Sequence, residues 1–126
     1  MKMHADRPEG ANAISRHAPE GVIIAGVAYR DSVLVPWQGA VQPWAVQRFE
    51  SLSEQSFEPV IALAPELVLF GSGGRLRFPP PAVLRALMAR RIGFEAMDTP
   101  AACRTYNVLL AEGRAVVAAL LFETRA

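Results

Sequence analysis

The sequence predicts a single layered α/β domain with a mostly buried sheet. Segments rich in β-forming residues alternate with segments of helical periodicity, and the connections between them are short. The segments 66–71 and 115–122 are almost entirely apolar, which is typical of strands covered on both faces. A chain of 126 residues with 52% hydrophobic and 20% charged side chains is large enough for one folded core and falls outside the disordered class.

The N-terminal part predicts an irregular arm over residues 1–19, because glycine and proline recur there without periodicity. The α/β domain itself is then expected over residues 20–126. Two β-rich runs, Gly21–Tyr29 and Ser32–Pro36, are separated by only two residues. This spacing predicts an N-terminal β-hairpin that turns at Arg30–Asp31.

Two helical segments flank the apolar strand at 66–71. In the first, the stretch 51–54 has the form of a capping box, and Pro59 either starts the helix or breaks it. In the second, over about 80–92, apolar residues recur at helical spacing, and Gly93 ends the helix.

A short strand at 94–97 precedes a third helix. Thr99 can cap this helix with Pro100 at its first position, and Gly113 can end it. The helix carries an apolar stripe, which predicts that it packs against the sheet. The stripe consists of Ala102, Cys103, Tyr106, Leu109 and Leu110.

The glycine-rich turn after the strand at 66–71 raises the question of a phosphate site. Gly71 and Gly73 match the first two positions of a dinucleotide-binding turn, but Leu76 stands where the third glycine belongs. The prolines at 79–81 also remove three N–H donors where the next helix begins. We therefore expect these glycines to permit a sharp exit from the strand rather than to hold a phosphate.

Polar residues also follow the predicted ends of two strands, and ligands of α/β sheets bind near such ends. One hypothesis is a cleft for a small anionic ligand, or an active site, between the turn Gly71–Gly74 and the start of the helix Asp98–Gly113. The alternative is that these residues cap the helix and form surface ion pairs. The candidate ligand residues are Ser72, Arg75, Asp98, Thr99, Arg104 and Asn107.

Charge is distributed unevenly along the chain. The net charge is only +1, but no acidic residue occurs between Glu66 and Glu95, where five arginines fall. We interpret this run either as a solvated surface or as a docking surface for an acidic partner protein, with Arg85, Arg90 and Arg91 on the partner face. Nucleic acid is not expected as the partner, because no aromatic residues alternate with the arginines.

Few other residues are candidates for chemistry. Cys103 shares the apolar stripe of the third helix, so we expect a packed, unreactive thiol. His4 and His17 both fall in the predicted arm, where we expect them to be exposed to solvent. They are too few for a metal site, so we expect no metal and no cofactor. No catalytic constellation is recognisable, and an enzymatic role is left open only for the cleft hypothesis.

Cysteine content and hydropathy indicate the compartment. A single cysteine excludes an internal disulfide framework. The N-terminus has no apolar signal region, and the longest apolar runs are too short to span a membrane. These observations predict a reducing, soluble compartment, most simply a bacterial cytoplasm.

Five segments of the second half of the chain form a characteristic ordered set. They are Leu69–Gly73, Phe78–Pro81, Gly93–Thr99, Ala102–Asn107 and Glu112–Arg114. Together they resemble the small Mth-type domain family, whose members include the adipogenesis-associated Mth domain protein and the mitochondrial complex I assembly factor 3.

The resemblance implies a three-layer α/β fold around a mixed, mostly parallel five-stranded sheet with one antiparallel strand. It also implies that the last strand is the antiparallel one and lies at the centre. It brings no catalytic residues, because no reaction is established for the family, and one relative acts by binding other assembly proteins. We therefore expect a non-catalytic accessory domain that acts through protein–protein contact, in an assembly-factor-like role.

Overall fold

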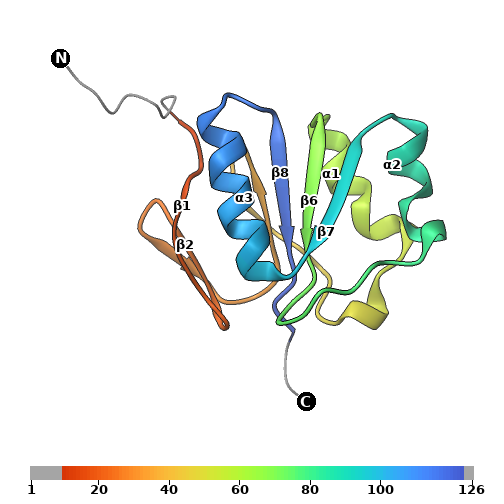
Figure 1. Ribbon diagram of the computed structural model, residues 1–126, viewed down its shortest axis with the longest axis horizontal. Coiled ribbons are helices and arrows are strands. Elements are labelled where there is room, and N and C mark those ends of the chain that lie inside the picture. Colours follow the sequence, from red (N-terminus) through yellow and green to blue (C-terminus); the bar gives the residue numbers. More distant parts are fainter. Residues whose placement is uncertain (1–9, 124–126) are drawn as a thin grey trace.

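In the computed structural model, which describes residues 10–123, the chain folds into three layers around a mixed sheet (Figure 1). The helices are α1 (Glu58–Leu63), α2 (Arg85–Ala89) and α3 (Thr99–Ala111). The larger sheet has the order β5-β4-β8-β6-β7, with β4 (Val33–Pro36), β5 (Gln42–Pro43), β6 (Leu67–Gly71), β7 (Gly93–Met97) and β8 (Val116–Leu120). The smaller sheet has the order β1-β2-β3, with β1 (Ile14–Ala18), β2 (Gly21–Ile24) and β3 (Val27–Tyr29). The predicted α/β class with a mixed five-stranded sheet is confirmed.

Strand β8 lies at the centre of the larger sheet and joins its two halves. It pairs in parallel with β6, which pairs in parallel with β7, whereas β4 pairs antiparallel with both β8 and β5. The central position of the last strand is confirmed, but the expectation that it is the antiparallel strand is wrong, since β4 is that strand. Helix α3 carries the chain from the C-terminal end of β7 back to the end of the sheet where β6 and β7 begin. Strand β8 therefore starts at that same end and runs parallel to them.

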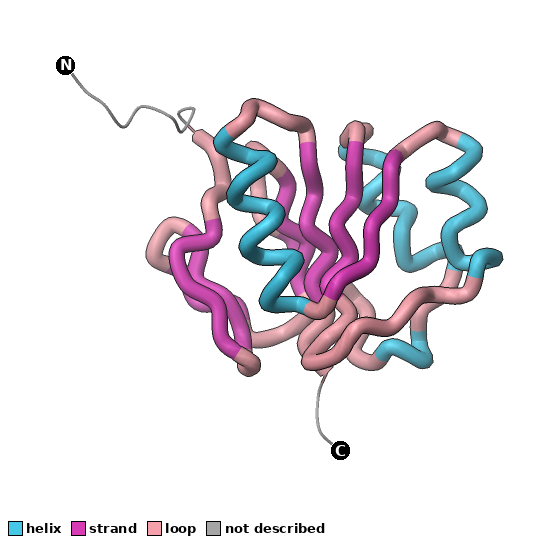
Figure 2. The backbone as a smooth tube through the Cα atoms, viewed as in Figure 1, coloured by secondary structure: helices cyan, strands magenta, loops and turns pink. Residues whose placement is uncertain are grey.

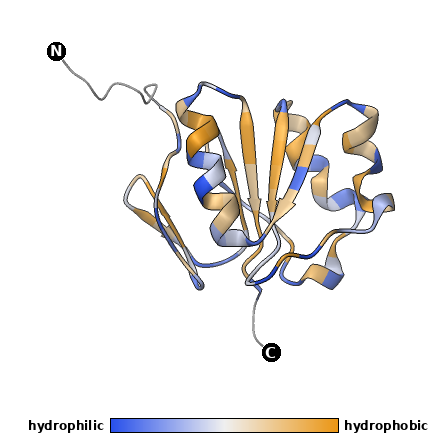
Figure 3. Ribbon diagram, viewed as in Figure 1, coloured by the Kyte–Doolittle hydropathy of each residue, from blue (hydrophilic) through white to orange (hydrophobic). Residues whose placement is uncertain are grey.

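The larger sheet is covered on both faces. Helix α3 and the smaller sheet lie on one face, and α1 and α2 lie on the other (Figures 1 and 2). Alternate residues of β8 therefore enter two cores, with Ala118 and Leu120 on the α3 side and Val117 and Ala119 on the α2 side. Hydropathy colouring shows the central strands as continuous apolar segments, as the sequence predicts (Figure 3).

The N-terminal hairpin turns at a different place from the predicted one. Strands β2 and β3 pair antiparallel across Ala25 and Gly26, which have φ values of 52° and 79°. Positive φ at both central residues matches the twist of a two-residue hairpin, so the run 21–29 folds back on itself. Residues 32–36, which were expected to form the second strand of the hairpin, contribute β4 to the larger sheet.

The arm expected over residues 1–19 is interrupted by a strand. Residues 14–18 form β1, which pairs with β2. Asn107 of α3 holds this strand in place, because its amide donates to the carbonyl of Ile14 at 2.8 Å and its Oδ1 accepts from the N–H of Ile14 at 2.9 Å. Such distant partners leave no local signal in the sequence. Residues 1–9 of the predicted arm lie outside the described residues.

Proline and capping residues mark the helix starts. Helix α1 has Pro59 in its first turn, so this proline starts the helix and does not break it. Asp98 caps α3 one residue before the predicted cap, because its Oδ1 accepts a hydrogen bond from the N–H of Ala101 at 2.9 Å. Among residues 10–123, none of the helices combines the length and apolar composition that a membrane span requires.

Candidate functional site

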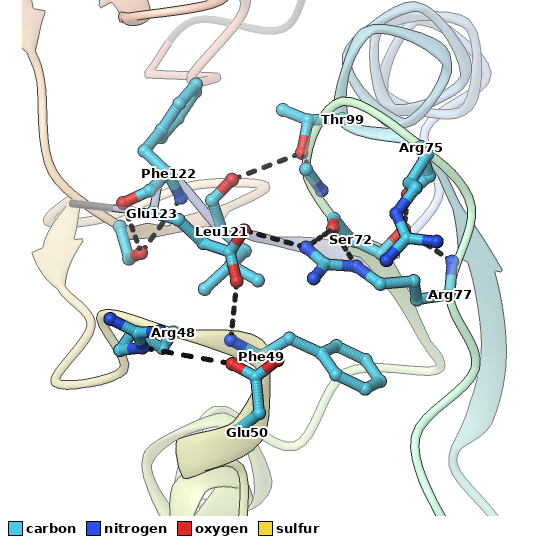
Figure 4. Close-up of polar contacts among 12 residues, drawn as sticks. Arg48, Phe49, Glu50, Ser72, Arg75, Arg77, Thr99, Leu121, Phe122 and Glu123 are labelled. Carbon is cyan, nitrogen blue, oxygen red and sulfur yellow. Dashed lines mark hydrogen bonds and ion pairs between the residues drawn. The ribbon is translucent and has the colours of Figure 1, made fainter. Parts of the chain in front are cut away.

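Ser72 holds the glycine-rich turn after β6 closed. Ser72 is fully buried, and its Oγ lies 2.7 Å from the carbonyl oxygen of Arg75 and 3.1 Å from that of Met97. The same oxygen accepts a hydrogen bond from the N–H of Arg77 at 2.9 Å (Figure 4). The Ser72 hydroxyl is therefore engaged inside the turn and serves its structure.

Thr99 joins this turn to the start of α3. Its Oγ1 accepts a hydrogen bond from the N–H of Gly73 at 2.8 Å and donates one to the carbonyl of Leu121 at 3.3 Å. Its own N–H donates to the carbonyl of Gly73 at 2.8 Å. The turn and the helix start thus lie side by side, and their polar groups bond to each other.

The main-chain donors of the turn are mostly engaged. The N–H of Ser72 donates to the carbonyl of Met97 at 2.8 Å, and the N–H of Gly73 donates to Thr99. A phosphate-binding turn needs several free N–H groups aimed at one point. This geometry supports the expectation that the glycines serve the backbone.

Replacement of Gly73 by alanine is expected to destabilise the fold by about 1–2 kcal/mol. Gly73 has φ of 102°, and a Cβ there would lie 2.9 Å from Nη2 of Arg77. Gly74→Ala is the matched control, because no atom lies within 4 Å of its added Cβ and its φ is outside the positive range. Urea unfolding of the two variants measures the difference, and equal stabilities would contradict this expectation.

Arg77 forms a partly buried cluster with Glu123 and Phe49 (Figure 4). Its Nη2 lies 3.0 Å from Oε1 of Glu123, and its guanidinium lies 4.7 Å from the centroid of the Phe49 ring. Burial alone would raise the pKa of Glu123, but hydrogen bonds from Arg77 and the N–H of Phe49, together with the charges of Arg77 and Arg48, lower this pKa overall. The cluster ties the segment after β8 to the glycine-rich turn.

A cavity of about 520 Å³ lies beside the same turn. Gly73, Gly74 and Thr99 line one side of it, and His17 and Glu123 also contribute to its wall. Of the six candidate ligand residues, Thr99 is the one that lines this cavity. Sequence reasoning placed His17 in solvent, and only its position next to the β1–β2 turn brings it to the cavity.

The other candidate ligand residues lie elsewhere. Asp98 caps α3, and Asn107 bonds to the main chain of Ile14 in β1. Arg75 and Arg104 are exposed to solvent. The structure therefore does not gather the six side chains around one cleft. Across the described part of the chain, no three histidine, cysteine, aspartate or glutamate side chains gather as a metal site requires.

The arginines of the predicted partner face are exposed. Arg85 is the first residue of α2, and Arg90 and Arg91 directly follow this helix. Large apolar side chains are also exposed in this part of the chain, and a surface that combines them with arginine is typical of protein-binding sites. We call five exposed residues the α2 surface: Arg85, Met88 (67% exposed), Arg90 and Arg91, which lie on or next to α2, and Phe78 (70%), which lines a groove together with Leu84.

Cys103 is expected to react with thiol reagents only after unfolding. It is fully buried on α3, as predicted, and burial raises its pKa to about 12, although the charge of Arg104 opposes this rise. The thiolate is the reactive form, so both access and ionisation oppose labelling near neutral pH. A colorimetric thiol assay with and without denaturant measures this, and rapid labelling of the native protein would contradict it.

Comparison with known proteins identifies relatives over nearly the whole domain. Residues 14–121 match the family described as "Protein of unknown function (DUF498/DUF598)". NADH dehydrogenase (ubiquinone) 1 alpha subcomplex assembly factor 3 of Bos taurus is 38% identical over 111 residues, which cover 86% of this chain and 59% of that protein. An uncharacterized protein of Rhodobacter capsulatus is 36% identical over 112 residues, which cover 89% of this chain and 86% of that protein. The chain thus spans less than two thirds of the bovine assembly factor.

Solved structures are similar to this chain in both fold and sequence. The crystal structure of a Bordetella parapertussis protein has a TM-score of 0.85 and 37% identity, and the match covers 90% of this chain and 98% of that chain. The solution structure of a Bordetella pertussis protein, described as an Mth938-like domain, has a TM-score of 0.84 and 31% identity, with 100% and 95% covered. These matches confirm the Mth-type resemblance. The chain belongs to the DUF498/DUF598 family, with an Mth938-like fold.

Proposed function

We propose that this protein is a non-catalytic accessory protein that acts by binding another protein, in an assembly-factor-like role. The α2 surface carries the proposal, because exposed arginine and apolar side chains occur there together. Arginine and aromatic side chains supply much of the binding free energy in protein interfaces. Relatives named as assembly factors support the role, since that name implies protein partners.

The charge of the α2 surface selects the kind of partner. Residues 67–94 contain arginine but no aspartate or glutamate, so the chain itself provides no neutralising charge within this stretch. An acidic partner surface would be attracted to it and would associate faster at low ionic strength. We therefore propose a partner with an acidic binding surface.

Charge reversal tests this function. In Arg85→Glu/Arg90→Glu, capture of a native partner by the tagged protein should fall at least about tenfold, which corresponds to about 1.4 kcal/mol of binding free energy. The matched control is Arg16→Glu/Arg30→Glu, which reverses two exposed charges on the N-terminal hairpin and its flank. Both variants should unfold within about 0.5 kcal/mol of the parent protein. Equal partner capture by both variants would overturn the proposal.

The cavity beside Thr99 favours a second candidate function, the binding of a small anionic ligand. The cavity adjoins the glycine-rich turn and the start of α3, as the cleft hypothesis requires. The imidazole of His17 can donate a hydrogen bond to such a ligand, and the carboxylate of Glu123 is paired with Arg77 at 3.0 Å. A thermal-shift screen with anionic metabolites and nucleotides separates the two functions. A stabilising ligand whose effect is lost in His17→Ala would favour the cavity.

A further inference from the structure

We infer that the outer edge of β7 binds an extended acidic segment of a partner protein by strand addition. This inference rests on the proposed function and specifies how the partner is held. It arises from three features that meet at one edge of the sheet. These are a strand whose outer edge pairs with no other strand of the described residues, an apolar groove beside it and the arginines of the α2 surface.

The strand is β7, which pairs with β6 on one side and is the outermost strand on its side of the larger sheet (Figure 1). Its hydrogen-bonding to β6 is fixed at both ends. The N–H of Gly93 donates to Glu66 at 3.0 Å, and the carbonyl of Met97 accepts from Ser72 at 2.8 Å. In a parallel ladder, alternate residues of a strand bond to the same neighbour. The N–H and C=O groups of Phe94 and Ala96 therefore point away from β6, towards the outer edge.

The groove lies along these outward-pointing groups. It has a volume of about 300 Å³, and its wall includes both Phe94 and Ala96. Phe78, Pro79 and Leu84 line the opposite side, on the segment that leads from the glycine-rich turn into α2. A strand added at β7 would place every second side chain on the face where this groove lies. The groove thus favours a partner segment with apolar residues at alternate positions.

The charges beside the groove favour an acidic segment. Arg85 follows the groove residue Leu84 in the chain, and Arg90 and Arg91 come just before the start of β7. The one acidic side chain of β7 is Glu95, which lies on the groove wall and is exposed. An added acidic strand must keep its carboxylates away from Glu95 and near the arginines, which restricts its register.

A second copy of this chain fits the edge less well. Antiparallel pairing of two β7 strands about their midpoint would place Glu95 opposite Glu95, and like charges directly across a ladder are destabilising. It would also bring two arginine-rich surfaces together. The arginines favour an acidic partner over a second copy of this chain, and the outer edge of β7 remains a template for pairing with another chain.

The experiment starts from a random 12-residue peptide library selected against the native protein. Enriched peptides should alternate acidic and apolar residues. The best peptide is then synthesised, and its Kd is measured by fluorescence anisotropy. The Kd should rise at least tenfold in Arg85→Glu/Arg90→Glu and stay within twofold in Arg16→Glu/Arg30→Glu. No enrichment, or enriched peptides without acidic residues, would overturn the inference.

N-methylation of the peptide tests the strand geometry without altering the protein. Methyl groups on alternate amides should abolish binding where the N–H faces β7 and leave it unchanged where the N–H faces away. On the protein side, Ala96→Pro removes an outward N–H while leaving the bonds to β6 intact, and it should raise the Kd at least tenfold. A methylation scan without this alternation would overturn strand addition.

The outcomes separate this inference from the proposed function. If arginine reversal weakens partner capture but the methylation scan shows no alternation, the protein binds a partner by another geometry. If arginine reversal has no effect on the native partner, the proposed function fails. Sedimentation of the free protein tests the second copy, and a dimer that Ala96→Pro dissociates would assign the edge to self-association and overturn the inference.

Discussion

Phe70→Ala is expected to cost about 3–5 kcal/mol of the free energy of unfolding. Phe70 is fully buried in β6. Its ring centroid lies 6.1 Å from those of Trp44 and Phe94 and 6.4 Å from that of Phe57. Removing the ring deletes these contacts and leaves a cavity between the sheet and the α1–α2 layer. Such a loss is a large part of the roughly 5–15 kcal/mol that stabilises a typical domain.

Phe78→Ala is the matched control for this prediction, because it removes the same side chain from a site that is 70% exposed. Its effect on stability should stay within about 0.5 kcal/mol. Urea unfolding followed by tryptophan fluorescence measures both variants, since Trp44 adjoins Phe70. A loss of less than 1 kcal/mol in Phe70→Ala would show that this aromatic cluster does not hold the two layers together.

Tyr106→Ala is expected to have a similarly large effect, about 3–5 kcal/mol. Tyr106 is fully buried on α3, and its hydroxyl lies 2.9 Å from the carbonyl oxygen of Asn12 and 3.0 Å from that of Pro36. The ring fills the α3-side core, while the hydroxyl joins the helix to the chain on either side of the N-terminal hairpin. Both contributions are lost in the alanine variant.

Tyr106→Phe separates these two contributions. It keeps the ring but removes the hydroxyl donor, while the carbonyl of Pro36 still accepts a hydrogen bond from the side-chain amide of Asn12 at 2.9 Å. The loss should therefore cost about 0.5–1.5 kcal/mol. Burial raises the pKa of Tyr106, so the hydroxyl stays protonated and keeps its donor role throughout the pH range in which the protein is handled. Equal unfolding free energies for Tyr106→Phe and the parent protein would show that water replaces the hydroxyl.

The sequence predicts those parts of the fold in which local pattern and burial agree. Strands β6 and β8 are continuous apolar runs, and the Cys103 and Tyr106 stripe faces the sheet as its spacing predicts. The hairpin was misplaced because Ala25 and Gly26 lie inside one apolar run, and only their positive φ values reveal the turn. Local composition cannot distinguish a long strand from two short ones when the turn residues are small and apolar.

The candidate site was harder to predict than the fold. Ser72, Thr99 and Asp98 were identified as polar residues at strand ends, but their hydrogen bonds go to neighbouring main-chain groups. A polar residue at such a position can bind a ligand or close a turn, and the sequence pattern is the same for both. The sequence predicts a solvent-exposed His17, whereas the structure places it in the cavity wall. Its neighbours there come from the chain that follows β8, and such distant contacts leave no local signal in the sequence.

The position of β8 has a consequence for how the protein folds during synthesis. Within the described residues, β8 is the strand that joins the β5–β4 pair to the β6–β7 pair in the larger sheet, and it follows all four in the chain. Until the ribosome has released residues 116–120, the two halves share no backbone hydrogen bonds, and β4 and β6 each expose an unpaired edge. Such edges promote aggregation of incomplete chains, so a translational pause or truncation before β8 should increase dependence on chaperones.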